Sequence, residues 1–256
     1  MLYRPLLMAS VALGAALLTG CPGTVSTDGI DSFTVRSANW LVLIEGTTRS
    51  HALVAGSVDG YCGKRQNAEA ERQLAFDQHQ ERLDSGTPLC ESLDVYYDDL
   101  ARAFNPIEKP GASYVTIILA RDVESQDMDA ITAPAAGHYQ QLGGTSDGTF
   151  TANLTYHTAK WNQQWADGWG CEDLSEAELD DPIVLGQLLA QVTAEVEFPD
   201  TYSLSAAQMD IEEPSEDRRK VDVDGDILDG TTTIGNFDAS FTATKCEVQL
   251  ADQIDL

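Results

Sequence analysis

Basic residues are scarce in this sequence of 256 residues. Lys and Arg total 15 against 42 Asp and Glu, which gives a formal net charge of −27 at pH 7. Nucleic-acid binding depends on Lys and Arg that neutralise phosphates, and the one basic cluster, Arg218-Arg219-Lys220, is flanked by acidic residues. We therefore expect no nucleic-acid partner and interpret the cluster as a locally neutralised strand end. The acidity fits either solubility at high salt or attraction for divalent cations.

Signatures of the common enzyme classes are missing as well. The four histidines lie in no H-E-x-x-H motif, and neither a G-x-S-x-G nor a G-x-x-x-x-G-K-[ST] motif occurs. His79 lies on a charged helical stretch and His157 on the polar side of a strand, so both are expected to face solvent. Only His138 lies in an irregular region that would suit a site. The sequence predicts a protein that is not an enzyme, with no catalytic residue, no cofactor and no firm metal site.

A short apolar run opens the chain and ends at a cysteine. Arg4 precedes the apolar stretch Leu6–Leu18, and the small residues Thr19 and Gly20 come before Cys21. A membrane-spanning helix needs roughly 20 apolar residues, so this shorter stretch favours a secretory signal over a transmembrane anchor. An ordinary signal peptide cleaved nearby is the alternative. Leu-Leu-Thr-Gly-Cys, ending at Cys21, resembles the lipobox of bacterial lipoproteins.

This resemblance implies cleavage before Cys21, a diacylglyceryl thioether on its sulfur and usually a further acyl chain on its amino group. Two or more acyl chains hold a protein at a membrane almost permanently. We therefore expect a signal peptide over residues 1–20 and a lipidated, flexible tether over 21–32. The implied location is the bacterial cell envelope, with the outer membrane favoured over the inner membrane. The whole chain is also similar to small lipoproteins of myxobacteria and related bacteria, in part through Phe241–Cys246, and this similarity implies no activity.

Four cysteines follow Cys21, and an even number in an exported chain favours two disulfides. Three pairings are open. Cys62 with Cys90 would close a loop of about 28 residues, and Cys171 with Cys246 would tie the last third of the chain together. A zinc site is not expected, because no C-x-x-C pair is present.

Alternation of apolar and polar side chains predicts eight short strands. The two clearest are Phe150–His157 and residues 237–244, where Phe237, Ala239, Phe241 and Ala243 share one face. The other six predicted strands are Phe33–Arg36, Trp40–Glu45, Ala52–Ser57, Tyr114–Ala120, Val192–Phe198 and Arg219–Val223. Eight such strands are typical of a sandwich or a barrel.

Helical patterns interrupt these strands. Lys64–Leu83, with an apolar stripe of Leu74, Phe76 and Leu83, and Leu89–Phe104 predict a helical hairpin. A further helix is expected over Leu174–Leu189, where Ser175 and Glu178 match a capping box and Pro182 splits the helix. The predicted fold is α+β: a mostly antiparallel β-sandwich or barrel-like sheet of about eight strands with an inserted helical hairpin. It forms a single acidic domain over residues 33–256.

Two patterns suggest ligands. Asp222, Asp224, Asp226 and Asp229 resemble the opening of a calcium loop, but Ile227 stands where such a loop needs Gly and Thr233 where it needs Glu. The Asp224-Gly225 and Asp229-Gly230 pairs are equally typical of tight turns.

Three tryptophans form the second pattern. Trp161, Trp165 and Trp169 recur every four residues and on a helix would share a face able to stack on sugars, although such stripes are more often core. The sequence therefore predicts a membrane-anchored envelope lipoprotein, structural or interaction-forming, with an unnamed envelope protein or glycan as partner. The alternative is a calcium- or glycan-binding module.

Overall fold

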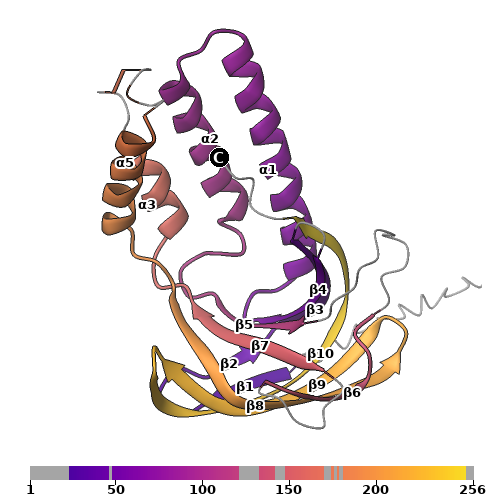
Figure 1. The fold of residues 1–256 in the computed structure, drawn as a ribbon. Coiled ribbons are helices and arrows are strands. Elements are labelled where there is room, and N and C mark those ends of the chain that lie inside the picture. Colours follow the sequence, from indigo (N-terminus) through magenta and orange to yellow (C-terminus); the bar gives the residue numbers. More distant parts are fainter. Residues whose placement is uncertain are drawn as a thin grey trace, which may run out of the picture.

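The structure, a computed structural model, describes residues 23–45, 48–120, 133–141, 148–169, 174–175, 178 and 181–251. Within these ranges the fold is α+β, with one mixed sheet of ten strands and four helices (Figure 1). The helices are α1 (Tyr61–Asp84), α2 (Leu89–Phe104), α3 (Trp161–Gly168) and α5 (Pro182–Glu195). The strands are β1 (Gly23–Thr27), β2 (Phe33–Val35), β3 (Ser37–Glu45), β4 (Thr48–Gly56), β5 (Ser113–Ala120), β6 (Gly137–Gln140), β7 (Thr149–Tyr156), β8 (Asp200–Ser215), β9 (Arg218–Asp229) and β10 (Thr232–Ala251).

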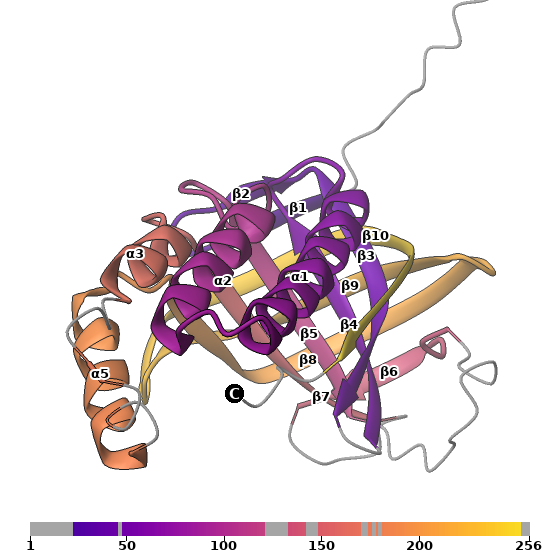
Figure 2. The same ribbon diagram turned by 90° about the horizontal axis from the view of Figure 1, so that it is seen from above.

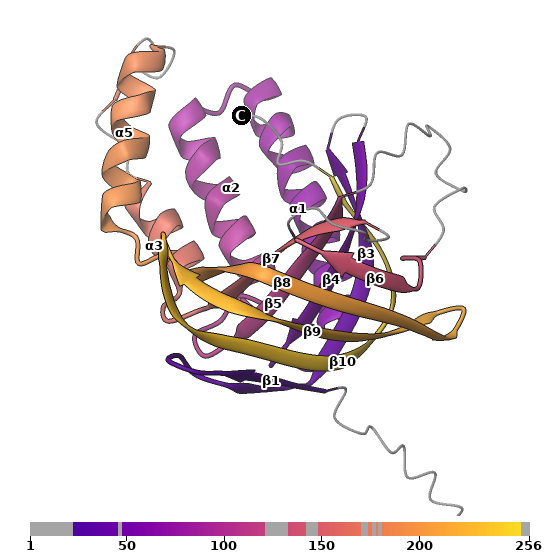
Figure 3. The ribbon, with the colours of Figure 1, turned by 60° about the horizontal axis from the view of Figure 1, so that its bottom comes forward.

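The strand order of the sheet is β2-β1-β10-β3-β4-β5-β7-β8-β6, and β9 pairs with both β10 and β8. The β10–β3 pair is parallel and the other strand pairs are antiparallel. The long strands β8, β9 and β10 curl beneath the rest of the sheet (Figure 3). The β7–β8 ladder is short, and the β10–β3 register shifts between Lys245 and Gln249. The sheet is mixed and is not closed into a barrel. The α+β class is confirmed, and the predicted sandwich or barrel is corrected to one mixed sheet.

Seven of the eight predicted strands lie in β2, β3, β4, β5, β7, β9 and β10. The strand predicted over Val192–Phe198 is wrong, because residues 192–195 are the last turn of α5. Leu188, Val192 and Val196 are buried at a spacing of four residues, which is the period of a helix face. The short run of apolar residues in this segment did not distinguish strand from helix.

The predicted helical hairpin is confirmed as α1 and α2, which stand together on one side of the sheet (Figures 1 and 2). The buried stripe of α1 differs from the predicted one. It consists of Tyr61, Ala68, Ala75 and His79, whereas Leu74 is 55% exposed. Small alanines on this stripe allow α1 to lie close to α2.

Buried apolar side chains form three clusters. The main core lies inside the curl of the sheet, with Trp40, Leu53 and Ile117 on one side and Val223 and Phe241 on the other. A second cluster lies between α1 and the opposite face of β3, β4 and β5, and a third joins α2, α3 and α5. Strand β4 is therefore buried on both faces, which explains its nearly continuous apolar sequence.

The segment predicted as a tether contains the first strand of the sheet. Gly23–Thr27 pairs with β10 and with β2, and Val25 is buried in the main core. Gly23 is needed at its position, since a Cβ there would lie 2.0 Å from the carbonyl oxygen of Ser240. Residues 23–27 are thus part of the sheet, and Cys21 lies outside the described residues.

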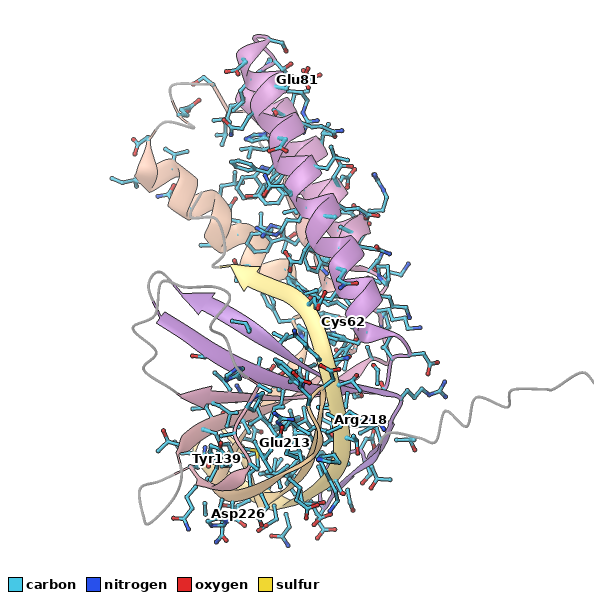
Figure 4. All side chains as sticks on the ribbon, turned by 90° about the vertical axis from the view of Figure 1, so that its right-hand side faces the viewer. Cys62, Glu81, Tyr139, Glu213, Arg218 and Asp226 are labelled. Carbon is cyan, nitrogen blue, oxygen red and sulfur yellow. A yellow bond between two sulfur atoms is a disulfide. The ribbon has the colours of Figure 1, made fainter. Side chains whose placement is uncertain are left out.

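One disulfide joins α1 to the last strand. Cys62 bonds to Cys246, with Cα atoms 5.6 Å apart and a sequence separation of 184. Figure 4 shows Cys62 at the base of α1, beside β10. Both bridges considered from the sequence, Cys62–Cys90 and Cys171–Cys246, are therefore wrong. Cys90 is also disulfide-bonded, and Cys171 lies outside the described residues.

Candidate functional site

A polar cavity of about 140 Å³ lies where the base of α1 meets the outer face of the sheet. Helix α1 contributes Tyr61 and Arg65, and the loop after α2 contributes Glu108. The remaining polar lining comes from the sheet and its end: Tyr114, Thr116, Thr155 and His157. Polar groups thus dominate a cavity that is surrounded by apolar clusters.

Local geometry explains why these side chains meet. Tyr61 and Arg65 are four residues apart and share a face of α1. Tyr114 and Thr116 alternate onto the same face of β5, and Thr155 on β7 lies directly opposite Tyr114.

The loop between α2 and β5 is fixed by hydrogen bonds to its neighbours. The hydroxyl of Tyr114 donates to the carbonyl oxygen of Ile107, one residue before Glu108. The main chain of His157 accepts a hydrogen bond from Gly111 N at 2.7 Å and donates one to Ala112 O at 2.8 Å. These hydrogen bonds hold the loop that carries Glu108 against the main chain of His157.

Glu108 is the carboxylate of the cavity. Its Oε2 accepts a hydrogen bond of 2.6 Å from Nδ2 of Asn162, in the first turn of α3. Burial raises the pKa of the Glu108 carboxyl, against the lowering effects of the Asn162 hydrogen bond and the Arg65 charge. Glu108 forms no ion pair with another described residue.

Arg65 is held by charges on its own helix. Its Nη2 lies 2.6 Å from Oε1 of Glu69, and Oε2 of the same glutamate lies 2.8 Å from Nε of Arg72. The guanidinium also lies 4.9 Å from the ring centroid of Phe104, a cation–π contact. Nε of Arg65 is buried and has no hydrogen-bond partner among the described residues, so one donor of the cavity arginine is unused.

His157 is buried, with 7% of its surface exposed, and its ring lies perpendicular to that of Tyr114 at 5.8 Å. Its Nδ1 has no hydrogen-bond partner within the described part of the chain. Burial lowers the pKa of His157, so the imidazole is neutral at pH 7. The prediction that His157 faces solvent is wrong, because this residue, one position after the end of β7, lines the cavity between α1 and the sheet.

The other histidines named from the sequence lie elsewhere. His79 is also buried, contrary to the prediction, and its Nδ1 lies 2.8 Å from Oγ of Ser92 on α2. Its ring stacks at 5.2 Å on Tyr96. His138 lies on β6, where its Nδ1 is 2.9 Å from Oδ1 of Asp210, and it does not line the cavity.

The calcium candidates are spread along a strand. Asp222, Asp224 and Asp226 alternate along β9 and share its outer face, so neighbours are separated by about 7 Å. Asp222 is already bound by Lys220 Nζ at 2.9 Å and by Ser240 Oγ at 2.6 Å. In the described part of the chain no group of three or more potential metal ligands gathers. Asp229 ends β9 and Gly230 has φ 59°, which confirms the turn interpretation for that pair, whereas Asp224-Gly225 lies inside β9.

The tryptophans belong to the core between the helices. Trp169 is 2% exposed and stacks on Trp165, with ring centroids 6.4 Å apart. Tyr97 of α2 lies 4.6 Å from Trp169. These contacts support the core interpretation of the three tryptophans over a sugar-stacking face.

Sequence reasoning missed Arg65 and Glu108 entirely. Neither lies in a motif, and the signal that was available, the i,i+4 spacing of Arg65 and Glu69, is common on solvent-exposed helices. Comparison of the chain with protein-family models, curated proteins and solved structures gave no match. None of the described helices is long and apolar enough to cross a membrane.

Proposed function

We propose that this protein is a lipid-anchored, non-enzymatic binding protein of a bacterial envelope, which holds a small polar solute in the cavity between α1 and the sheet. The observation that carries the proposal is the cavity itself, which collects Arg65, Glu108 and His157 in one place. Burying such groups costs free energy unless each has a partner. A bound solute supplies the partners that the fold leaves out.

The size of the cavity limits the solute. An apolar cavity of about 150 Å³ accommodates benzene, which has six non-hydrogen atoms. The cavity here measures about 140 Å³ and is lined by hydroxyl, imidazole, guanidinium and carboxyl groups. A solute of about six non-hydrogen atoms with hydrogen-bonding groups at both ends matches this lining better than an apolar one.

The surroundings of His157 fit a binding role better than a catalytic role. In catalytic triads, a further group orients the histidine base through its second nitrogen. Nδ1 of His157 has no such partner among the described residues, and its nearest aromatic contact is the ring of Tyr114. These features favour a binding role over an acid–base role.

The proposed anchoring at the envelope rests on the sequence around Cys21. Lipidation of Cys21 would leave only Pro22 between the acyl chains and β1. The anchor would therefore hold the edge of the sheet formed by β1 and β2 close to the bilayer surface. A solute-binding domain held in this way samples the solution next to the membrane.

A thermal-shift screen of the purified full chain against small polar solutes tests the proposal. A ligand that binds only the folded state raises Tm. At a ligand concentration of 100 times Kd, the free energy of unfolding increases by about 2.7 kcal/mol. The expected result is a saturable rise that is lost in Glu108→Gln and kept in Glu91→Gln, which changes an exposed glutamate of α2. A screen in which no solute raises Tm, or in which both variants respond like wild type, would overturn it.

A further inference from the structure

The cavity carboxylate forms no direct ion pair with another described residue, although the charge of Arg65 acts on it across the cavity. Glu108 receives one neutral hydrogen bond, from Asn162, and Arg65 is bound to Glu69 at 2.6 Å. Glu108 is half-buried, and a partly desolvated carboxylate without a directly bound cation gains from a cationic group brought into hydrogen-bond distance. The second oxygen of Glu108 is therefore suited to accept hydrogen bonds from an ammonium group.

Aromatic rings stand beside this carboxylate. The ring centroids of Tyr61 and Tyr114 lie 5.5 Å apart with an interplanar angle of 60°, and both residues line the cavity. Ring faces attract cations, most strongly where water is excluded. His157 completes the aromatic side, and as a neutral imidazole it does not repel a cation.

Arg65 is suited to bind an oxygen acceptor on the ligand, whereas Glu108 is suited to bind a cation. Its buried Nε–H has no acceptor among the described residues, and it lines the same cavity as Glu108. Nε itself is closed off from solvent, so an oxygen acceptor on the ligand would bind the accessible part of the guanidinium. The cavity thus presents one carboxylate for a cation and one guanidinium for an oxygen.

We infer that the ligand is a small solute with an ammonium group and an oxygen acceptor a few bonds apart, the chemistry of amino acids and amino alcohols. Glu108 binds the ammonium group beside the rings of Tyr61 and Tyr114, and Arg65 donates to the oxygen. This inference rests on the proposed function, since it names the ligand class of the same cavity. The net charge of −27 favours the approach of such a cation over that of an anion.

Calorimetric titration with small probes of similar size tests the inference. Alanine and ethanolamine carry both groups, propylamine only the ammonium, propionate only the acceptor, and 1,2-propanediol no charge. We expect alanine and ethanolamine to bind at least tenfold more tightly than the other three probes. Equal or tighter binding of propionate or 1,2-propanediol would overturn the role of Glu108, and equal or tighter binding of propylamine would overturn the role of Arg65.

Substitutions at Glu108 and Tyr61 test which side chains contact the ligand. Glu108→Gln should weaken alanine binding at least tenfold while circular dichroism shows an intact fold. Tyr61→Phe keeps the ring and should bind within about threefold of wild type. Tyr61→Leu removes the ring and should lose about tenfold, or about 1.4 kcal/mol, which lies within the range of a cation–π contact. Wild-type binding by Tyr61→Leu would contradict the aromatic wall.

The two proposals fail in different ways. If none of the five probes and no other polar solute in the screen binds, the proposed function is wrong and the inference falls with it. If a neutral or anionic solute binds and Glu108→Gln abolishes its binding, the binding function stands and the ammonium class is wrong.

Discussion

Cys62 and Cys246 join the first turn of α1 to the last strand of the sheet through a disulfide whose Cα atoms lie 5.6 Å apart. Cys62 directly follows Tyr61, which lines the cavity, and both cysteines pack in the cluster between α1 and the sheet. The bridge therefore holds one wall of the cavity against the sheet that forms the other.

Removing this disulfide should destabilise the fold strongly. The chain-entropy estimate for a loop closed over 184 residues is about 5 kcal/mol. Urea unfolding of Cys62→Ser, Cys246→Ser and the double variant should show losses of that order, and the double variant should lose no more than either single one. Peptide mapping under non-reducing conditions should recover a Cys62–Cys246 peptide, and a Cys62–Cys90 peptide would refute the pairing.

Glu108→Gln should stabilise the protein at pH 7. Burial raises the folded pKa of Glu108, so the folded state binds more protons than the unfolded state and stability falls as pH rises through the raised pKa. The neutral amide avoids this loss. We expect Tm to be higher than that of wild type at pH 7, and this gain should disappear below the ordinary glutamate pKa of about 4.3.

Glu69→Gln is the matched control for that measurement. Glu69 lies on the neighbouring face of α1 and pairs with both Arg65 and Arg72, at 2.6 Å and 2.8 Å. Its removal should lower Tm at pH 7, because two arginines lose their common partner. A lower Tm for Glu108→Gln, equal to that of Glu69→Gln, would show that Glu108 is a stabilising residue.

The buried histidines should make the fold sensitive to mild acid. Burial lowers the folded pKa values of His79 and His157, so the unfolded state takes up protons first as pH falls below about 6.5. Their contribution is complete above that pH and is lost below it. His157→Phe keeps the ring contact with Tyr114, so its stability, measured by urea unfolding, should fall less than that of wild type between pH 7 and pH 5. Parallel pH curves for the two proteins would contradict this assignment.

Arg219 should be the most sensitive basic residue of the sheet. Its side chain is 4% exposed and donates to the carbonyl oxygens of Pro134 at 2.6 Å and Ser215 at 2.9 Å, beside an ion pair with Glu213 at 3.3 Å. Arg219→Ala should cost about 1–3 kcal/mol in chemical denaturation, because the buried carbonyl oxygen of Pro134 loses its donor. Its neighbour Arg218 is exposed, and Arg218→Ala should change stability by no more than about 0.5 kcal/mol.

Local periodicity explains which elements could be predicted from the sequence. Phe237, Phe241 and Ala243 of β10 alternate without interruption and were assigned correctly. Strand β8 was missed because its pattern shifts by one residue at a bulge, where Ala206 has φ 50° and the buried positions change from Leu204 to Ala207. A bulge moves the apolar side chains out of a strict period of two.

The cavity could not be predicted in the same way. Glu108 and Asn162 are separated by 54 residues, and their contact arises only because the loop after α2 and the start of α3 meet over the sheet. Arg65 lies on a helix whose charged sequence is typical of a solvent-facing surface. Burial of these charges is a property of the tertiary arrangement, which residue spacing alone does not encode.

Lipidation at Cys21 gives the last prediction. The full chain with Cys21→Ser should lose the acyl mass and appear either in the soluble fraction or as an uncleaved precursor, because the thioether forms on the cysteine sulfur. Pro22→Ala leaves that sulfur in place and should stay in the membrane fraction. Only one residue separates Cys21 from β1. If the acyl chains are missing, there is therefore no long linker between Cys21 and β1 that could contact the bilayer in their place. Processed Cys21→Ser protein that stays in the membrane fraction after a high-salt wash would therefore rule out the lipid anchor.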